Sequence, residues 1–140
     1  MKLKKIMAAM VACLVTWVSL GTVHAITKTD AVSPLYLYTQ TVIATLEISG
    51  GGYATCCGKI KTRELESEIS ITVTLYRQSG KDWIRVDGWG NLKTGTNMLA
   101  LQKRRSVEKG TYMVVVTGRV TPKEGNPESV RGTSNIITYQ

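Results

Sequence analysis

Histidine is almost absent from this 140-residue sequence, and its one histidine, His24, lies near the amino end. Residues 26–140 therefore contain no imidazole to act as a base near neutral pH, which excludes Ser-His-Asp and Cys-His catalysis in their usual forms. Zinc sites built from histidine and cysteine are excluded for the same reason. The sequence predicts a protein that is not an enzyme and that uses no metal or other cofactor.

Cysteine is also scarce, with Cys13, Cys56 and Cys57 as its three positions. Two adjacent thiolates cannot supply the four tetrahedral ligands of a structural zinc ion. Strand alternation would bury Cys56 as a small hydrophobic residue and expose Cys57 as a free thiol. A vicinal disulfide would break this alternation and is the minority alternative. An exposed thiol without an internal partner favours pairing with a second chain or with a small thiol in an oxidising compartment.

The first 25 residues are typical of a secretory signal peptide. Three lysines among the first five residues precede an apolar run from Ile6 to Leu20, and the small residue Ala25 follows. The run is shorter than the roughly 20 residues of a membrane-spanning helix. We expect cleavage after Ala25 and a secreted, extracellular protein that can remain associated with the cell surface. Attachment to a membrane through an uncleaved or lipidated signal, for which Val11–Cys13 is a loose match, is the minor alternative.

Basic residues outnumber acidic ones, with 18 Lys and Arg against 10 Asp and Glu. The predicted signal peptide contains three of the lysines and no acidic residue, so the net charge of residues 26–140 is +5. A moderate positive charge favours anionic surfaces such as wall polymers, and it also keeps a small protein soluble. No nucleic-acid recognition motif accompanies the charge, so no nucleic-acid partner is expected.

After the signal peptide, short alternating segments rich in Val, Ile, Thr and Tyr recur between Gly, Asn, Ser and Pro, as expected for strands and turns. Seven of these segments predict strands: 41–48, 53–61, 69–77, 83–89, 97–103, 111–121 and 133–139. Their spacing indicates an all-β fold, a seven-stranded antiparallel β-sandwich. The single domain should span residues 39–140 and follow a loose amino-terminal arm over residues 26–38. Three polar segments are expected to be linkers: 63–68, 90–96 and 122–128.

Exposed aromatic residues are the first candidates for a binding surface. Tyr53 and Tyr76 are expected to project outward from their strands, and Trp83 and Trp89 to share one face of a hairpin in which Gly88 marks a β-bulge. Such rings stack on sugars or anchor protein interfaces. The alternative is that both tryptophans belong to the core of so small a domain.

A basic run is the second candidate. Lys103, Arg104 and Arg105 are consecutive, and with Lys59, Lys61 and Arg63 they could form a patch for anionic glycans or wall polymers. Runs of this kind are more often the solvated end of a strand.

The stretch "VEKGTY", which ends at Tyr112, resembles the corner before the sixth strand of immunoglobulin-like and fibronectin type III domains. The resemblance implies that the Tyr112 hydroxyl bonds a backbone carbonyl and that Gly110 forms the tight turn before it. It also implies that Cys56 stands where the first half of the inter-sheet disulfide would be. The position of the second half is Val114, so that disulfide is absent.

The signal peptide with the stretches "YTQTVIATLEISGGGYATC", "LYRQSGKDWIRVDGW" and "VEKGTYMVVV" also resembles an uncharacterised family of small secreted proteins from Gram-positive bacteria. That resemblance implies no activity. From the sequence we expect a non-catalytic binding module for a surface glycan, a wall polymer or a protein. The competing hypothesis is a structural or interaction protein that forms a disulfide-linked homodimer through Cys57.

Overall fold

The computed structural model describes residues 29–31 and 36–140, and every regular element in these ranges is a β-strand. The strands are β1 (Thr29–Ala31), β2 (Thr39–Ile48), β3 (Tyr53–Thr62), β4 (Ser67–Ser79), β5 (Asp82–Thr96), β6 (Met98–Ser106), β7 (Gly110–Thr121), β8 (Glu128–Thr133) and β9 (Ile137–Tyr139). The predicted signal peptide over residues 1–25, with Cys13 and His24, lies outside the described residues. Among the described residues there is no helix with the length and apolar character to cross a membrane.

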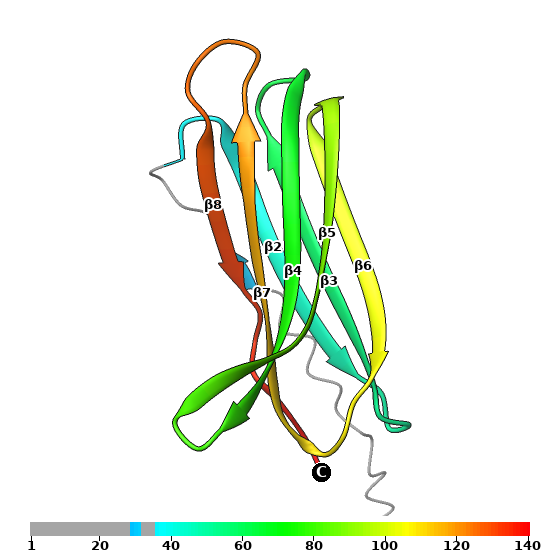
Figure 1. Cartoon of the computed structure of the whole chain (residues 1–140). Helices are drawn as coiled ribbons and strands as arrows, with labels where there is room; N and C mark the ends of the chain where they lie inside the picture. Colours follow the sequence, from blue (N-terminus) through cyan, green and yellow to red (C-terminus); the bar gives the residue numbers. More distant parts are fainter. Residues whose placement is uncertain (1–28, 32–35) are drawn as a thin grey trace, which may run out of the picture.

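The strands form two antiparallel sheets packed face to face (Figure 1). Sheet A has the order β1-β2-β3-β6, and Sheet B has the order β5-β4-β7-β8 with β9 also paired to β7. The connections β2–β3, β4–β5 and β7–β8 are hairpins, because consecutive strands pair directly in each case. The all-β antiparallel sandwich expected from the sequence is confirmed.

The strand boundaries differ from the predicted ones in three places. β1 pairs with β2 inside the segment 26–38 that was expected to be loose. Residues 90–96 continue β5 along β4 instead of forming a linker. A final strand was predicted over residues 133–139, but the structure has two short strands there. β8 lies mostly before residue 133, and β9 covers only Ile137–Tyr139. β1, β5 and β8 are all outermost in their sheets, where one side of the strand faces water and the apolar alternation that reveals a strand is weak.

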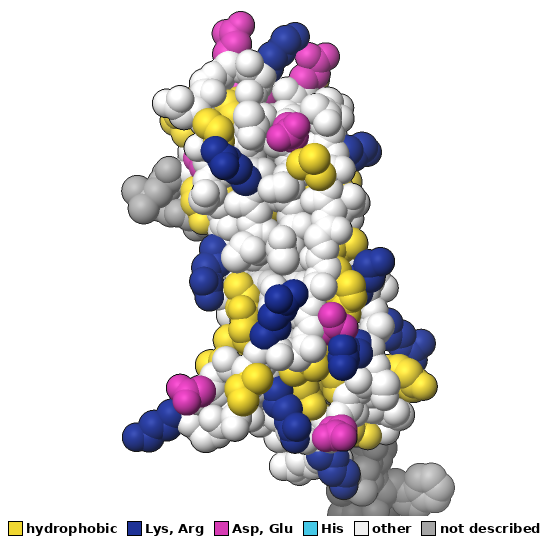
Figure 2. All heavy atoms as spheres, in the orientation of Figure 1, with side chains coloured by type: hydrophobic (Ala, Val, Ile, Leu, Met, Phe, Trp, Pro, Cys, Tyr) yellow, Lys and Arg dark blue, Asp and Glu magenta, His cyan; other side chains and the backbone are white. Residues whose placement is uncertain are grey.

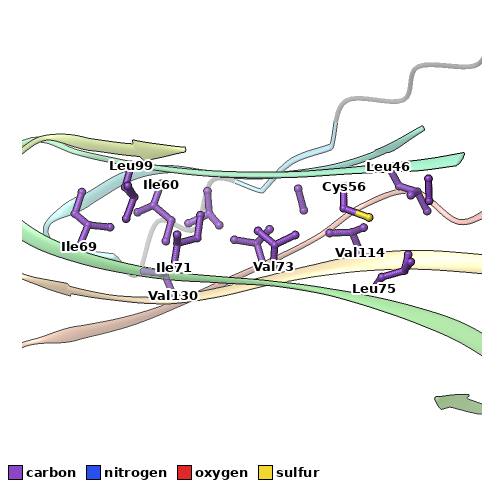
Figure 3. Close-up of a cluster of buried hydrophobic side chains, with 14 of the residues drawn as sticks. Leu46, Cys56, Ile60, Ile69, Ile71, Val73, Leu75, Leu99, Val114 and Val130 are labelled. Carbon is purple, nitrogen blue, oxygen red and sulfur yellow. The ribbon is translucent and has the colours of Figure 1, made fainter. Parts of the chain in front are cut away.

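The core fills the space between the sheets with the inward residues of alternating positions (Figure 3). Its members are buried side chains from six strands: Val42, Ala44, Leu46, Ala54, Cys56, Ile60, Ile69, Ile71, Val73, Leu75, Leu99, Tyr112, Val114, Val116, Val120 and Val130. Burial of each large aliphatic side chain contributes about 1.5–3 kcal/mol relative to exposure. The period-two pattern of the sequence thus identified most of the core.

Gly58 allows the two sheets to approach each other closely at the centre of this core. A β-carbon on Gly58 would lie 2.6 Å from a methyl carbon of Val73 and 2.7 Å from one of Val116. Both distances are shorter than any normal carbon–carbon contact, so a larger residue here would force the sheets apart. Methyl groups of Val73 and Val116 from Sheet B therefore occupy the space that a side chain at Gly58 would need.

Tyr112 fixes the connection between β6 and β7. Its ring is buried, and its hydroxyl donates a hydrogen bond of 2.7 Å to the carbonyl of Glu108, four residues earlier, which is the kind of contact that the resemblance of "VEKGTY" to the immunoglobulin corner implies. Gly110 is the first residue of β7 instead of part of the turn. Its missing side chain makes room for Arg77, whose Nη2 donates a hydrogen bond of 2.7 Å to the carbonyl of Lys109.

Glu128, at the start of β8, anchors the segment that leads into β2. Its carboxylate accepts hydrogen bonds from the backbone N–H groups of Leu37, Tyr38 and Thr39 and from the Thr39 hydroxyl. Burial of the carboxylate alone raises the pKa of Glu128, but these hydrogen bonds outweigh burial and hold the pKa below its ordinary value. The carboxylate therefore connects β8 of Sheet B to the first residue of β2 in Sheet A.

Replacement of Tyr112 by phenylalanine should lower the free energy of unfolding by about 1 kcal/mol or more, because the Glu108 carbonyl loses its partner. Urea unfolding followed by fluorescence measures this difference. Tyr139→Phe is the matched control, since that hydroxyl makes only a long 3.4 Å contact with the carbonyl of Gly50. Equal unfolding midpoints for the two variants would show that the hydroxyl of Tyr112 does not hold the corner.

Glu128→Gln should lower stability at neutral pH by about 1.5–3 kcal/mol, the range for hydrogen bonds to charged groups. Because the folded pKa of Glu128 is depressed, its contribution is complete above the ordinary glutamate pKa of about 4.3 and is lost as the pH falls through the lower folded value. The difference between the unfolding midpoints of wild type and Glu128→Gln should therefore be largest at pH 7 and become smaller as the pH is lowered below about 4.3. Glu124→Gln, in the exposed loop before β8, should match wild type across this pH range, and a constant difference between wild type and Glu128→Gln would contradict this account.

Candidate functional site

A β-bulge at Val86 determines which residues of β5 face outward. Leu75 lies opposite Asp87 and Tyr76 lies opposite Arg85, so Val86 has no single partner in β4. The bulge is in the hairpin where it was expected, but it lies two residues before Gly88. Val86 packs against the core, and the alternation of β5 changes phase at this residue.

The change of phase places the two tryptophans on opposite faces of the hairpin, so the prediction that they share a face is wrong. Trp89 lies opposite Val73 and packs against the core. Trp83 lies opposite Gln78, on the face that is turned away from the core, and its ring is half-buried. The core location that was considered for both tryptophans thus applies to Trp89, and the outward location applies to Trp83.

The distal part of the β4–β5 hairpin projects from the sandwich. The last residue of β4 that has a partner in β7 is Arg77, opposite Tyr112, so residues 78–83 extend past the end of the sheet. Figure 1 shows this part leaving the lower end of the sandwich (green). We name residues 76–85 the arm.

The outer face of the arm and the adjacent part of β7 bring together four side chains that are common in binding surfaces. Tyr76 lies opposite Arg85 in β5 and opposite Met113 in β7. Trp83 is the diagonal neighbour of Tyr76, at a distance of about 7–8 Å that is within reach of aromatic side chains. Trp, Tyr, Arg and Met are the residue types enriched at interfaces and their hot spots. We call Tyr76, Trp83, Arg85 and Met113 the arm surface.

Two arginines surround Asp87 at the base of the arm. The guanidinium of Arg85 folds over Gly88, where an added β-carbon would lie 2.5 Å from its Nη2. Arg105 of β6 forms an ion pair with Asp87, which joins the edges of the two sheets. The hydrogen bond from Arg105, followed by that from the Gly88 N–H, holds the pKa of Asp87 below its ordinary value. Asp87 thus stays ionised and keeps the base of the arm in place.

The basic run in β6 is divided between two faces of Sheet A, because successive strand residues point in opposite directions. Arg104 is on the outer face, where its guanidinium carbon lies 4.3 Å from the centre of the Tyr53 ring, a cation–π contact. Lys103 and Arg105 lie opposite Cys56 and Ala54 on the inward side. The run does not form one cationic surface.

The other predicted members of the basic patch are also separated from the run. Lys59 lies opposite Ala100, which is four residues along β6 from Arg104 and thus about 13 Å away. Lys61 is two residues farther along β3, and Arg63 is in the loop after it.

Cys56 and Cys57 are divided by the alternation of β3. Cys56 is fully buried, and Figure 3 shows it facing Val114 across the core. Burial, with smaller effects of Cys57 and Asp87, raises the pKa of the Cys56 thiol to about 12. Cys57 is partly exposed on the outer face of Sheet A between Thr45 and Gln102, and both cysteines are free.

A shallow depression on the outer face of Sheet B was not predicted from the sequence. It has a volume of ≈ 470 Å³ and is lined by Tyr36, Ser70, Thr72, Thr117, Gly118, Ser129, Val130 and Arg131. We call it the trough. The only available signal was that the outward positions of β4 are small and hydroxylated, Ser70 and Thr72 among them, which is also an ordinary pattern for a solvated strand.

A scan against protein-family models finds no match for this sequence, and a search among curated proteins finds none either. The fold defines the class as an antiparallel two-sheet β-sandwich. Within residues 29–31 and 36–140, no three acidic, cysteine or histidine side chains come together as ligands for a metal ion. The arm surface and the trough lie on the same outer face of Sheet B, so this face is the candidate functional site.

Alkylation of the folded protein with iodoacetamide at pH 8 should modify Cys57 and leave Cys56 unmodified, because Cys56 is buried and its thiol stays protonated. Tandem mass spectrometry of the tryptic peptide distinguishes the two adjacent positions. Alkylation in urea should modify both, and Cys57→Ser should abolish the reaction of this peptide in the folded state. Equal rates at both positions in the folded protein would contradict the assignment of inward and outward cysteines.

Proposed function

We propose that this protein is a non-catalytic extracellular binding module that attaches to a cell-surface partner through the arm surface. The observation that carries the proposal is the gathering of Tyr76, Trp83 and Arg85 on a hairpin that projects from the sandwich, next to Met113 of β7. These side chains are not members of the hydrophobic core, so they are available for contacts with a partner without any loss of core packing.

The location and the non-catalytic character rest on the sequence. The amino-terminal 25 residues have the features of a secretory signal, and the rest of the chain has no histidine to serve as a catalytic base. A net charge of +5 after removal of the signal is compatible with attachment to a negatively charged cell envelope.

We further infer that the sandwich is a variant of the immunoglobulin and fibronectin type III arrangement. In support, β3 and β7, which correspond to the second and sixth strands of those domains, lie in opposite sheets and face each other through Cys56 and Val114. The hydrogen bond of Tyr112 supports the same relationship. Membership of the Gram-positive secreted family rests on the resemblance of the sequence alone.

A disulfide-linked homodimer through Cys57 is the competing proposal, and the position of the thiol gives it little support. A disulfide needs α-carbons about 4.4–6.8 Å apart, whereas sheets that pack face to face lie about 10 Å apart. Cys57 is in the middle of such a face, between Thr45 and Gln102. A small thiol can reach it more easily than a second folded copy can.

Trp83→Ala and Tyr76→Ala should each weaken binding of the protein to purified cell envelope of the producing organism by tenfold or more, since loss of a hot spot costs about 2 kcal/mol. Sedimentation of labelled protein with the envelope at low salt measures the affinity. Leu65→Ala is the matched control, because Leu65 is an exposed residue in the loop between β3 and β4, at the opposite end of β4 from the arm. Unchanged binding of the arm variants, or no retention of the wild type, would refute the proposal.

A further inference from the structure

We propose that the trough binds a neutral glycan chain and that this chain continues along β4 onto the arm surface. The inference rests on the proposed function and specifies its ligand. It follows from three features of the outer face of Sheet B: the shape of the trough, the chemistry of its lining, and its continuity with the arm.

The shape of the trough results from small outward residues between larger ones. Ser70, Thr72 and Thr117 form its middle, and Tyr36 and Arg131 border it beside β8, where the Arg131 N–H donates a hydrogen bond of 3.1 Å to the Tyr36 hydroxyl. Its volume of ≈ 470 Å³ is within the range of about 300–1,000 Å³ that is usual for ligand pockets.

A glycine maintains the floor of the trough. A β-carbon on Gly118 would lie 2.4 Å from the carbonyl oxygen of Ser70 and 2.3 Å from Cδ1 of Ile60. Any other residue would push β7 away from β4 or from the core, so the close spacing of strands under the trough depends on this glycine.

The lining has the hydrogen-bonding character of a sugar site. Four hydroxyl side chains, those of Ser70, Thr72, Thr117 and Ser129, line it, and each can both donate and accept, as sugar hydroxyls do. Arg131 adds a fixed set of donors, and no carboxylate is present in the lining. A cationic ligand would find no counter-charge in this lining. Arg119, which lies opposite both Ser70 and Ser129 on the same face, is a second cation beside the trough, so the four hydroxyl groups outnumber the two cations at the site.

Figure 2 shows how charge is distributed around this site. A broad white band of uncharged, non-hydrophobic groups crosses the middle of the face of Sheet B, while charged and hydrophobic side chains appear toward its two ends and margins. A protein partner would favour an apolar centre with a polar rim. The arrangement seen here is the reverse, which favours a polar, neutral ligand.

The trough is continuous with the arm surface. The outward residues of β4 after Thr72 are Thr74 and then Tyr76, about 13 Å from Thr72. The partner of Thr72 in β5 is Gly90, which has no side chain to obstruct a chain lying on this face. The partner of Thr74 is Gly88, and over it lies the guanidinium of Arg85, a donor of the arm surface. A glycan in the trough can thus extend to Tyr76 and Trp83, whose rings offer stacking surfaces for sugar rings.

The test is isothermal titration calorimetry with six-sugar oligomers of glucose and of N-acetylglucosamine as neutral probes and with hexagalacturonate as the anionic probe. We expect a neutral oligomer to bind and hexagalacturonate not to bind. The double variant Thr72→Val/Thr117→Val, which removes two hydroxyls and keeps side-chain shape, should weaken binding at least tenfold. Thr45→Val, the same change on the outer face of Sheet A, should have no effect. Trp83→Ala should also weaken binding of the hexamer.

Each other result decides against the inference. If the protein binds purified envelope through the arm but binds no neutral oligomer, the glycan assignment is wrong while the proposed function stands. If hexagalacturonate alone binds, or if the double variant binds like wild type, the trough is not the site. If Trp83→Ala leaves hexamer binding unchanged, the chain does not reach the arm. If the double variant has a lower unfolding midpoint than wild type, Arg131→Gln is used in its place, because Arg131 is exposed. The same tenfold loss of affinity for the neutral oligomer is expected.

Discussion

The close contact between the two sheets at Gly58 sets the geometry of the sandwich. Methyl groups of Val73 and Val116 occupy the space that a side chain at this position would need. β4 and β7, which carry these valines, are the central strands of Sheet B, and the other strands of that sheet pair with one or the other of them. The relative position of the sheets, and hence the rest of the packing, therefore depends on a glycine in Sheet A that faces two valines in Sheet B.

The β-bulge at Val86 explains how one hairpin contributes to both the core and the candidate site. Without the extra residue, Trp83 and Trp89 would point the same way, either both into the core or both into solvent. With it, Trp89 packs on Val73 while Trp83 faces outward beyond the end of β7. The single insertion thus lets β5 contribute Trp89 to the hydrophobic core at one end and place Trp83 on the outer face of the arm at the other.

The sequence was most informative where a strand is buried on one face. The inward residues of β4, from Ile69 to Leu75, and the division of Cys56 from Cys57 follow from a period of two. Edge strands were missed or misplaced because solvation removes that signal. The exact position of the bulge was also hidden, since Val86, Gly88 and Trp89 are compatible with either phase until the pairing with β4 is known.

The candidate site was predicted only in part, for a related reason. Sequence alternation placed Tyr76 outward, but whether Tyr76 and Trp83 are neighbours depends on the register of the hairpin. Alternation also separates Arg104 from Lys103 and Arg105, so a run that looks like one charge cluster in the sequence belongs to two faces. The trough involves β4, β7, β8 and Tyr36, which are far apart in the chain, and only their tertiary arrangement forms it.

The outer face of Sheet B contains residues that the stability of the fold does not require. Threonine suits a solvated strand, so Thr72 and Thr117 alone need no special explanation. Serine and especially glycine are poorer choices for a strand, yet Ser70, Gly88 and Gly90 lie together on this face. Local choices that oppose strand formation tend to occur where function imposes its own constraint. Ser70 and Gly90 leave the middle of this face without large side chains, and Gly88 makes room for the Arg85 guanidinium of the arm surface, as the proposed glycan path requires.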